Sequence, residues 1–97
     1  MKINKPLCNK ILQSLLEDYP STMSQSSWSK ATETETDIKH VATQFCYLEE
    51  KGLIQTNVEE CIDDGGNQAY LISLPLTKIN VYGIDFIEEG GFPLNIA

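Results

Sequence analysis

The chain has 97 residues and a mass of 10.9 kDa, which leaves room for one domain, and its hydrophobic content of 41% is normal for a protein that buries a core. Its basic residues are seven lysines with no arginine, set against 14 acids, for a net charge of −7. The chain therefore lacks the side chain that makes bidentate contacts with guanine and phosphate. All of the net charge lies in residues 49–97, because residues 1–48 carry five acids and five lysines.

The beginning of the chain and its cysteines bear on the cellular compartment. The first ten residues, MKINKPLCNK, contain no apolar segment of signal-peptide length, and no stretch approaches a membrane span. The three cysteines, Cys8, Cys46 and Cys61, are widely spaced and form no CxxC pair. We therefore expect a cytoplasmic protein with reduced thiols, no membrane partner and no cofactor.

Apolar residues at helical spacing predict a first amphipathic helix from about Pro6 to Tyr19. Its buried side is expected to contain Leu7, Cys8, Ile11, Leu12, Leu15 and Leu16. Residues 21–36, rich in serine and threonine, have two interpretations. They form either a polar loop or a short, weak helix capped by Ser21 or Thr22, with Trp28 against the core.

A second strong helix is predicted from about Asp37 to Lys51. Thr34 and Asp37 resemble a capping box before it, and Gly52 is well placed to end it. The expected buried stripe consists of Ile38, Val41, Ala42, Phe45 and Leu48. The expected exposed face consists of Thr36, Lys39, His40, Thr43, Gln44 and Tyr47.

The next segment reads as a β-hairpin. A strand from Leu53 to Ile62 and a returning strand from Ala69 to Leu74 flank the turn Asp63-Asp64-Gly65-Gly66-Asn67. Pro75 is expected to end the returning strand, because proline cannot donate to a sheet ladder.

A last helix of about residues 78–89 follows, capped by Thr77 and ended by Gly90-Gly91. Its apolar side is expected to contain Ile79, Tyr82, Phe86 and Ile87. Gly83 should weaken it by about 1 kcal/mol relative to alanine. The apolar tail with Phe92, Leu94 and Ile96 either folds over its own core or packs on a second subunit. The sequence slightly favours a homodimer through the last helix and tail.

Two segments resemble winged helix-turn-helix proteins. The run Tyr47-Leu48-Glu49-Glu50-Lys51-Gly52-Leu53-Ile54 is similar to the end of the recognition helix in the MarR and PadR families. The run from Thr77 to Gly91, TKINVYGIDFIEEGG, is similar to the ending of small bacterial and phage-type winged-helix proteins. With the order of elements, the resemblance implies one α+β winged-helix domain over residues 1–97. That domain would contain helices, a two-stranded antiparallel wing hairpin and a C-terminal helix.

The resemblance implies that the helix of about 37–51 enters the major groove of DNA, as in a transcriptional regulator of bacterial or prophage type. The candidate DNA contacts are then Thr36, Lys39, His40, Thr43, Gln44 and Tyr47. The Gln44 amide would read adenine, and Thr43 would meet a phosphate or a thymine methyl group. Lys39 and His40 would mostly contact phosphates.

The hairpin departs from this family pattern, because residues 55–74 contain four acids and no basic residue. These acids are Glu59, Glu60, Asp63 and Asp64. Affinity for DNA depends on neutralising phosphates, so this wing and the net charge of −7 disfavour DNA as a partner. A dimer whose wings point away would still bind DNA. The alternative is a protein–protein interaction module whose acidic wing meets a basic partner. The helix face and the family resemblance place the regulator slightly ahead.

No motif indicates an enzyme, because neither a nucleophile motif nor a phosphate-binding glycine loop is present. His40 reads as a solvated helical histidine without an evident partner. His40, Cys46 and Cys61 lack the spacing of a metal site. The acidic turn faintly resembles a calcium loop, but it lacks the closing glutamate of an EF-hand, so a hairpin tip is the simpler interpretation.

Overall fold

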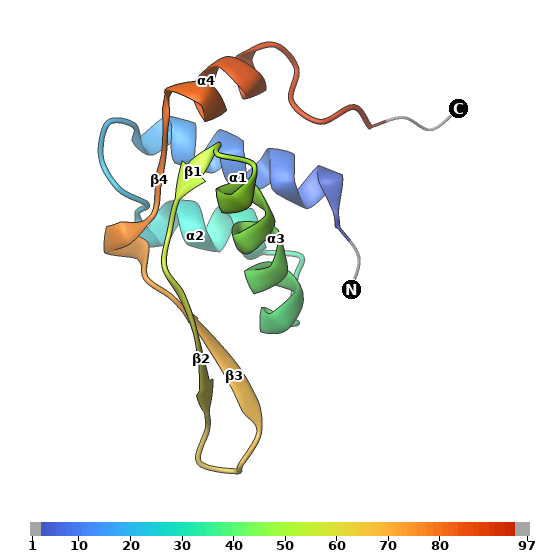
Figure 1. The fold of residues 1–97 in the computed structure, drawn as a ribbon, viewed down its shortest axis with the longest axis vertical. Coiled ribbons are helices and arrows are strands. Elements are labelled where there is room, and N and C mark those ends of the chain that lie inside the picture. The colour runs from blue at the N-terminus through green and yellow to red at the C-terminus, as the bar shows by residue number, and fades with distance from the viewer. Residues whose placement is uncertain (1–2, 95–97) are drawn as a thin grey trace.

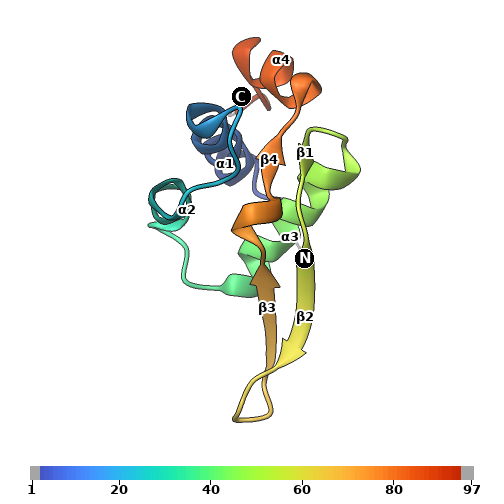
Figure 2. The ribbon, with the colours of Figure 1, turned by 90° about the vertical axis from the view of Figure 1, so that its left-hand side faces the viewer.

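The computed structural model describes residues 3–94 and has an α+β architecture (Figure 1). Its elements are α1 (Lys5–Asp18), α2 (Gln25–Thr32), α3 (Ile38–Glu50), β1 (Ile54–Gln55), β2 (Val58–Ile62), β3 (Gln68–Ile72), a 3₁₀ helix η1 (Leu74–Leu76), β4 (Lys78–Ile79) and α4 (Val81–Glu88). The helices gather at one end of the molecule, and the β2–β3 hairpin projects from them (Figures 1 and 2). Within residues 3–94, no helix is both long and apolar enough to cross a lipid bilayer.

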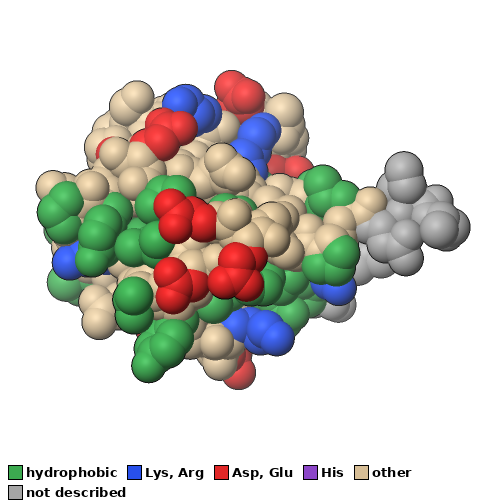
Figure 3. Space-filling view, turned by 90° about the horizontal axis from the view of Figure 1, so that it is seen from above, with side chains coloured by type: hydrophobic (Ala, Val, Ile, Leu, Met, Phe, Trp, Pro, Cys, Tyr) green, Lys and Arg blue, Asp and Glu red, His purple; other side chains and the backbone are tan. Residues whose placement is uncertain are grey.

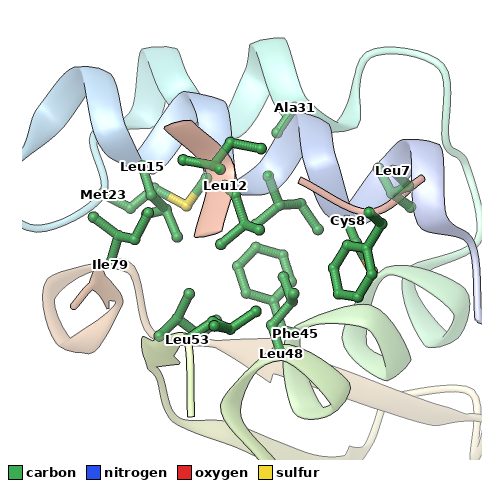
Figure 4. Close-up of a cluster of buried hydrophobic side chains, with 14 of the residues drawn as sticks. Leu7, Cys8, Leu12, Leu15, Met23, Ala31, Phe45, Leu48, Leu53 and Ile79 are labelled. Atoms are coloured by element: carbon green, nitrogen blue, oxygen red, sulfur yellow. The ribbon is translucent and has the colours of Figure 1, made fainter. Parts of the chain in front are cut away.

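The predicted first helix is confirmed as α1. Asn4 caps its beginning, since its side-chain oxygen accepts a hydrogen bond from the Leu7 backbone N–H at 3.0 Å. Pro6 occupies the first turn, where its missing N–H costs nothing. The apolar stripe of α1 lies against the rest of the core, in which Phe45 and Leu48 come from α3 and Leu53 and Ile79 from the base of the hairpin (Figure 4).

Of the two interpretations of residues 21–36, the helical one is confirmed, because α2 forms there. Its cap is Ser24 rather than Ser21 or Thr22: the Ser24 hydroxyl accepts the Ser27 N–H at 3.1 Å. The carboxylate of Asp18 accepts the Ser24 N–H at 2.8 Å and so holds the cap in place. Trp28 packs on Phe45 with ring centroids 5.8 Å apart, as expected of an anchor.

The second strong helix is confirmed as α3, and Gly52, with φ of +79°, follows its end. The expected capping box is wrong, because Asp37 is itself the cap and accepts the Lys39 N–H at 3.0 Å. Val41, Ala42, Phe45 and Leu48 are buried as predicted. Ile38 is 37% exposed, because it lies in the first turn, beside the cap.

The hairpin is confirmed, but the predicted strand of residues 53–62 is divided into β1 and β2, which belong to two separate ladders (Figure 2). In the outer ladder β2 pairs with β3, with Val58 opposite Ile72 and Glu60 opposite Tyr70. In the inner ladder Ile54 of β1 pairs with Ile79 of β4. The turn forms at the predicted place, and its Asp63 carboxylate accepts the Gly65 and Asn67 N–H groups at 2.9 and 2.8 Å.

The last helix begins later than predicted. Lys78 and Ile79 pair with β1, so α4 begins at Val81 with Asn80 as its cap. Thr77 is therefore not the cap; it is buried, and its hydroxyl lies 2.9 Å from that of Thr56. Tyr82, expected on the buried side, is 71% exposed, because α4 turns the side of Gly83 and Ile87 towards the core.

The sequence indicates only that Gly83 weakens the helix, but in the structure Gly83 has a packing role. A Cβ at this position would overlap the backbone oxygen of Leu53, so only glycine permits α4 to approach the inner ladder.

The C-terminal tail folds back over its own chain as far as it is described. Phe92 is buried and packs against Phe86 and Tyr47, with ring centroids 4.7 and 5.9 Å away. The Asn9 side chain bonds both backbone groups of Phe92, accepting from the N–H at 2.8 Å and donating to the carbonyl at 3.0 Å. Leu94 is exposed, and Ile96 lies outside the described residues.

Candidate functional site

A cavity of about 540 Å³ lies between α3 and the β2–β3 hairpin. We call it the α3–hairpin cavity. Three of the candidate DNA contacts line it together: Lys39, Thr43 and Tyr47. They share one face of α3, since positions three and four apart lie side by side on a helix. The structure thus brings half of the predicted set to one place beside the hairpin.

Of the other residues around the cavity, only Glu60 is a predicted site residue, as part of the acidic wing. The rest are Ile3, Ala42, Cys46, Glu50, Lys51, Val58 and Tyr70. Cys46 and Glu50 continue the row of Lys39 and Thr43 along α3, so helical spacing alone would have found them. Tyr70 comes from β3, and only the strand register reveals that it lies opposite Glu60.

The expected exposed position of Gln44 is wrong, because this side chain is fully buried. Its oxygen accepts the Asn4 backbone N–H at 2.8 Å and the Cys8 thiol at 3.4 Å. Its amide nitrogen donates to the His40 carbonyl at 3.1 Å. Gln44 therefore joins α3 to the start of α1, and its amide is not presented to a ligand. In the sequence, a polar residue at the edge of the apolar stripe resembles a surface residue, and only its tertiary partners reveal that it is buried.

The two remaining candidates lie outside the cavity lining. His40 is partly buried, and its Nε2 lies 3.3 Å from the Asn4 amide nitrogen and 3.9 Å from the Glu35 carboxylate. The expected histidine without a partner is thus wrong. Thr36 is exposed in the linker that precedes the Asp37 cap.

The four acids of the hairpin are all exposed, but they lie on different sides of it. Glu60 faces the cavity beside Val58, whereas Glu59 alternates to the opposite face. Asp63 is engaged in the turn, and Asp64 is exposed at the tip. The hairpin therefore offers negative charge in several directions, and only Glu60 joins the cavity.

The electrostatics around the C-terminal end of α3 are dominated by acids. Residues 46–74 contain six acids and one lysine, Lys51. Glu49 and Glu50 lie in the last turn of α3, which holds no basic residue, although a helix C-terminus favours cations. The ion pairs of lysines with acids between described side chains lie elsewhere, at Lys10–Glu33 and Lys30–Glu17. The charged side chains that line the cavity itself are balanced in sign: Lys39 and Lys51 against Glu50 and Glu60.

Two of the cysteines, Cys46 and Cys8, show little nucleophilic character. Burial, with Glu49 and Glu50 nearby, raises the pKa of the Cys46 thiol in the cavity. Burial raises the pKa of Cys8 to about 11. At neutral pH both are protonated thiols, the form that attacks poorly. Among residues 3–94, no group of three or more His, Cys, Asp and Glu side chains is arranged to hold a metal ion.

The two segments that carry the winged-helix resemblance meet at the base of the hairpin. The first spans the end of α3, Gly52 and the start of β1, and the second spans β4 and α4. Asn80 joins them, donating from its amide to the Gly52 carbonyl at 2.8 Å and from its backbone to Leu53 at 3.2 Å. In comparisons with known proteins, the chain matches no family model, no curated protein and no solved structure.

Proposed function

We propose that the chain is a winged-helix domain that binds a basic protein partner through α3 and the acidic β2–β3 hairpin. The winged-helix assignment is supported by the order of the elements: three helices, a two-stranded hairpin and a further helix. It is also supported by the position of α3 beside the hairpin, where the cavity lies.

The observation that carries a protein partner over DNA is the charge of the hairpin. Both strands and the turn project from the helices without one lysine or arginine, and their four acids are exposed (Figure 1). A duplex approaching α3 would bring its phosphates close to these carboxylates. Salt at physiological concentration screens charges over a distance of about 8 Å, so it reduces the repulsion between phosphates and carboxylates in direct contact very little. A basic protein surface has the complementary charge.

A DNA-binding regulator is the second candidate. It is favoured by Lys39, Thr43 and Tyr47, which share one face of α3 next to the hairpin. The sequence places this function slightly ahead, partly because the Gln44 amide could read adenine. The burial of Gln44 removes that contact, so we now place the protein-binding function first.

The proposal is tested by reversing the charge of the hairpin. Glu59→Lys, Glu60→Lys and Asp64→Lys are combined, and Asp63 is changed only to asparagine because its side chain holds the turn. The matched control is Glu88→Lys with Glu89→Lys, two exposed acids at the end of α4. Acidic side chains are visible on the surface of the molecule seen from above (Figure 3). We expect the hairpin variant to lose the partner proteins that the wild-type chain captures, and the control variant to keep them. Both variants should have the same free energy of unfolding as the wild type. Retention by the hairpin variant would refute the proposal.

A further inference from the structure

We infer that the outer edge of β2 accepts an extended basic segment of the partner as a third strand of the hairpin. The segment would place two adjacent basic residues beside Glu59 and Glu60, with apolar residues before and after them. This inference rests on the proposed function, because it specifies how the acidic hairpin binds its partner. It is carried by the hydrogen-bond pattern of the β2–β3 ladder, which turns one row of backbone groups on β2 outward.

Two hydrogen bonds show which residues of β2 are bonded to β3. The Asp63 N–H donates to the Asn67 carbonyl at 2.8 Å, and the Ser73 N–H donates to the Asn57 carbonyl at 3.0 Å. Along an antiparallel ladder, hydrogen-bonded pairs alternate with pairs that are not hydrogen-bonded. Counting inward from these two ends in the observed register gives the bonded residues of β2, which are Glu59 and Cys61.

The remaining residues of β2 direct their backbone groups away from β3. Val58, Glu60 and Ile62 belong to the pairs that are not hydrogen-bonded, so the N–H and the carbonyl of each lie on the outer side of β2. These groups make no hydrogen bond in the part of the chain that the structure describes. No helix or strand lies along this side of β2 (Figure 2). The edge therefore offers the alternating donors and acceptors that an added strand needs.

The outer edge of β2 is protected from pairing by acidic charge alone. Natural edge strands commonly carry a lysine, a proline or a bulge that hinders a further strand. The sequence of β2, VEECI, contains neither lysine nor proline, and its register with β3 is unbroken. Glu59 and Glu60 are exposed and lie on opposite faces of the hairpin, because successive side chains of a strand alternate. An acidic strand is therefore repelled from either face, whereas a basic strand is attracted.

The same charges disfavour a second copy of this chain as the added strand. Two β2 edges paired with each other would bring the glutamates of both copies together, and like charges across a sheet are destabilising. Residues 55–74 contain no basic residue that could offset this repulsion. Lys39 of α3 lines the cavity together with Glu60, but the two form no ion pair among the described side chains. The edge thus fits a basic segment from another protein.

The side chains of β2 define the pattern of the segment that it accepts. Residues directly opposite each other in an antiparallel pair lie on the same face, with their Cβ atoms about 5 Å apart. Because Glu59 and Glu60 are adjacent, the two basic residues opposite them are adjacent as well. Apolar residues fit opposite Val58, Cys61 and Ile62. The side chain of Ile62 is 68% exposed in the free chain, so an added strand would cover apolar surface there.

The test uses a capped peptide with two adjacent lysines between two pairs of valines, and two forms of it that are methylated on the backbone. One form carries methyl groups on the first, third and fifth backbone nitrogens, and the other on the second, fourth and sixth. Both keep the charges and side chains of the parent peptide. A third strand donates hydrogen bonds only through alternate residues. Calorimetry with the full chain should therefore show at least about tenfold weaker binding of one methylated form and little change for the other.

Hydrogen exchange followed by NMR locates the added strand on the protein. The parent peptide should slow exchange of the Val58, Glu60 and Ile62 amides at least about tenfold, because these amides gain acceptors. Ile62→Pro removes one outward N–H at a place where an edge strand tolerates proline. This variant should bind the peptide about fivefold more weakly than Ile62→Ala, the matched control, which also lacks the isoleucine side chain but keeps the N–H.

Several results would overturn the inference. They are equal binding of the two methylated peptides, unchanged exchange of the three amides, and no binding of the parent peptide. A dimer of the free chain in which these amides are already protected would assign the edge to a second copy instead. If partner capture still depends on the hairpin charges in these cases, the proposed function stands and only the strand addition fails.

Discussion

The side-chain oxygen of Gln44 in α3 accepts a hydrogen bond from the backbone N–H of Asn4, the residue that caps α1, at 2.8 Å. This bond joins two helices that are distant in the sequence, and Gln44 is buried completely around it. A residue in the row expected to face DNA thus belongs to the framework that positions α1 against α3.

Gln44→Ala should therefore lower the free energy of unfolding by about 1–3 kcal/mol, because the Asn4 N–H and the Cys8 thiol lose a buried acceptor. Urea unfolding followed by circular dichroism measures the change. Lys39→Ala, an exposed change on the same helix, serves as the control and should stay within about 0.5 kcal/mol of the wild type. A Gln44→Ala protein as stable as the wild type would show that this bond contributes nothing to the fold.

Gly83→Ala should destabilise the protein, although alanine is favoured over glycine within helices by about 1 kcal/mol. The added Cβ would overlap the Leu53 oxygen and crowd the Ile79 side chain, and such overpacking costs about 1–3 kcal/mol. Thermal unfolding compares this variant with Asp85→Ala on the exposed side of α4. An increase in Tm for Gly83→Ala would mean that α4 does not approach β1 as closely as described.

Cys46 should react slowly with iodoacetamide at pH 8.5, because its raised pKa leaves less thiolate than an ordinary cysteine has at that pH. Reactivity should increase as the pH rises above 9.0, the ordinary value of the thiol. Glu49→Gln with Glu50→Gln removes two causes of the shift, so it should lower the pKa and speed alkylation. Mass spectrometry of the labelled peptides gives the rate at each position. Unchanged alkylation of Cys46 in this variant would contradict the electrostatic part of the explanation.

The helices and the hairpin could be predicted because their signals are local. The apolar stripe of α1, the glycine after α3 and the Asp63–Asn67 turn all lie within short stretches of sequence. The start of α4 was misplaced because the pairing of Ile79 with Ile54 depends on residues 25 positions apart. Thr77 looked like a cap by its position in the sequence, yet the ladder delays the helix until after Asn80.

The candidate site was predicted mainly on its helical side, with Glu60 alone from the hairpin. Lys39, Thr43 and Tyr47 follow from the exposed row of α3, whereas the contribution of Tyr70 depends on how the hairpin packs against that helix. Gln44 could not be recognised as buried, because its partners, the Asn4 backbone and Cys8, come from another segment of the chain. Helical spacing predicts which residues share a face, and tertiary packing decides whether that face meets solvent.

The most direct test of the central claim is fluorescence anisotropy of the purified protein with two labelled probes, a peptide of alternating lysine and glycine and a mixed-sequence DNA duplex, at low and physiological salt. A basic partner on the acidic hairpin predicts that the peptide binds and is lost with the Glu59→Lys, Glu60→Lys and Asp64→Lys variant, while the duplex does not bind even at low salt. Duplex binding that falls steeply with salt and is lost in Lys39→Glu, with no binding of the peptide, would contradict the account and establish α3 as a DNA-binding helix.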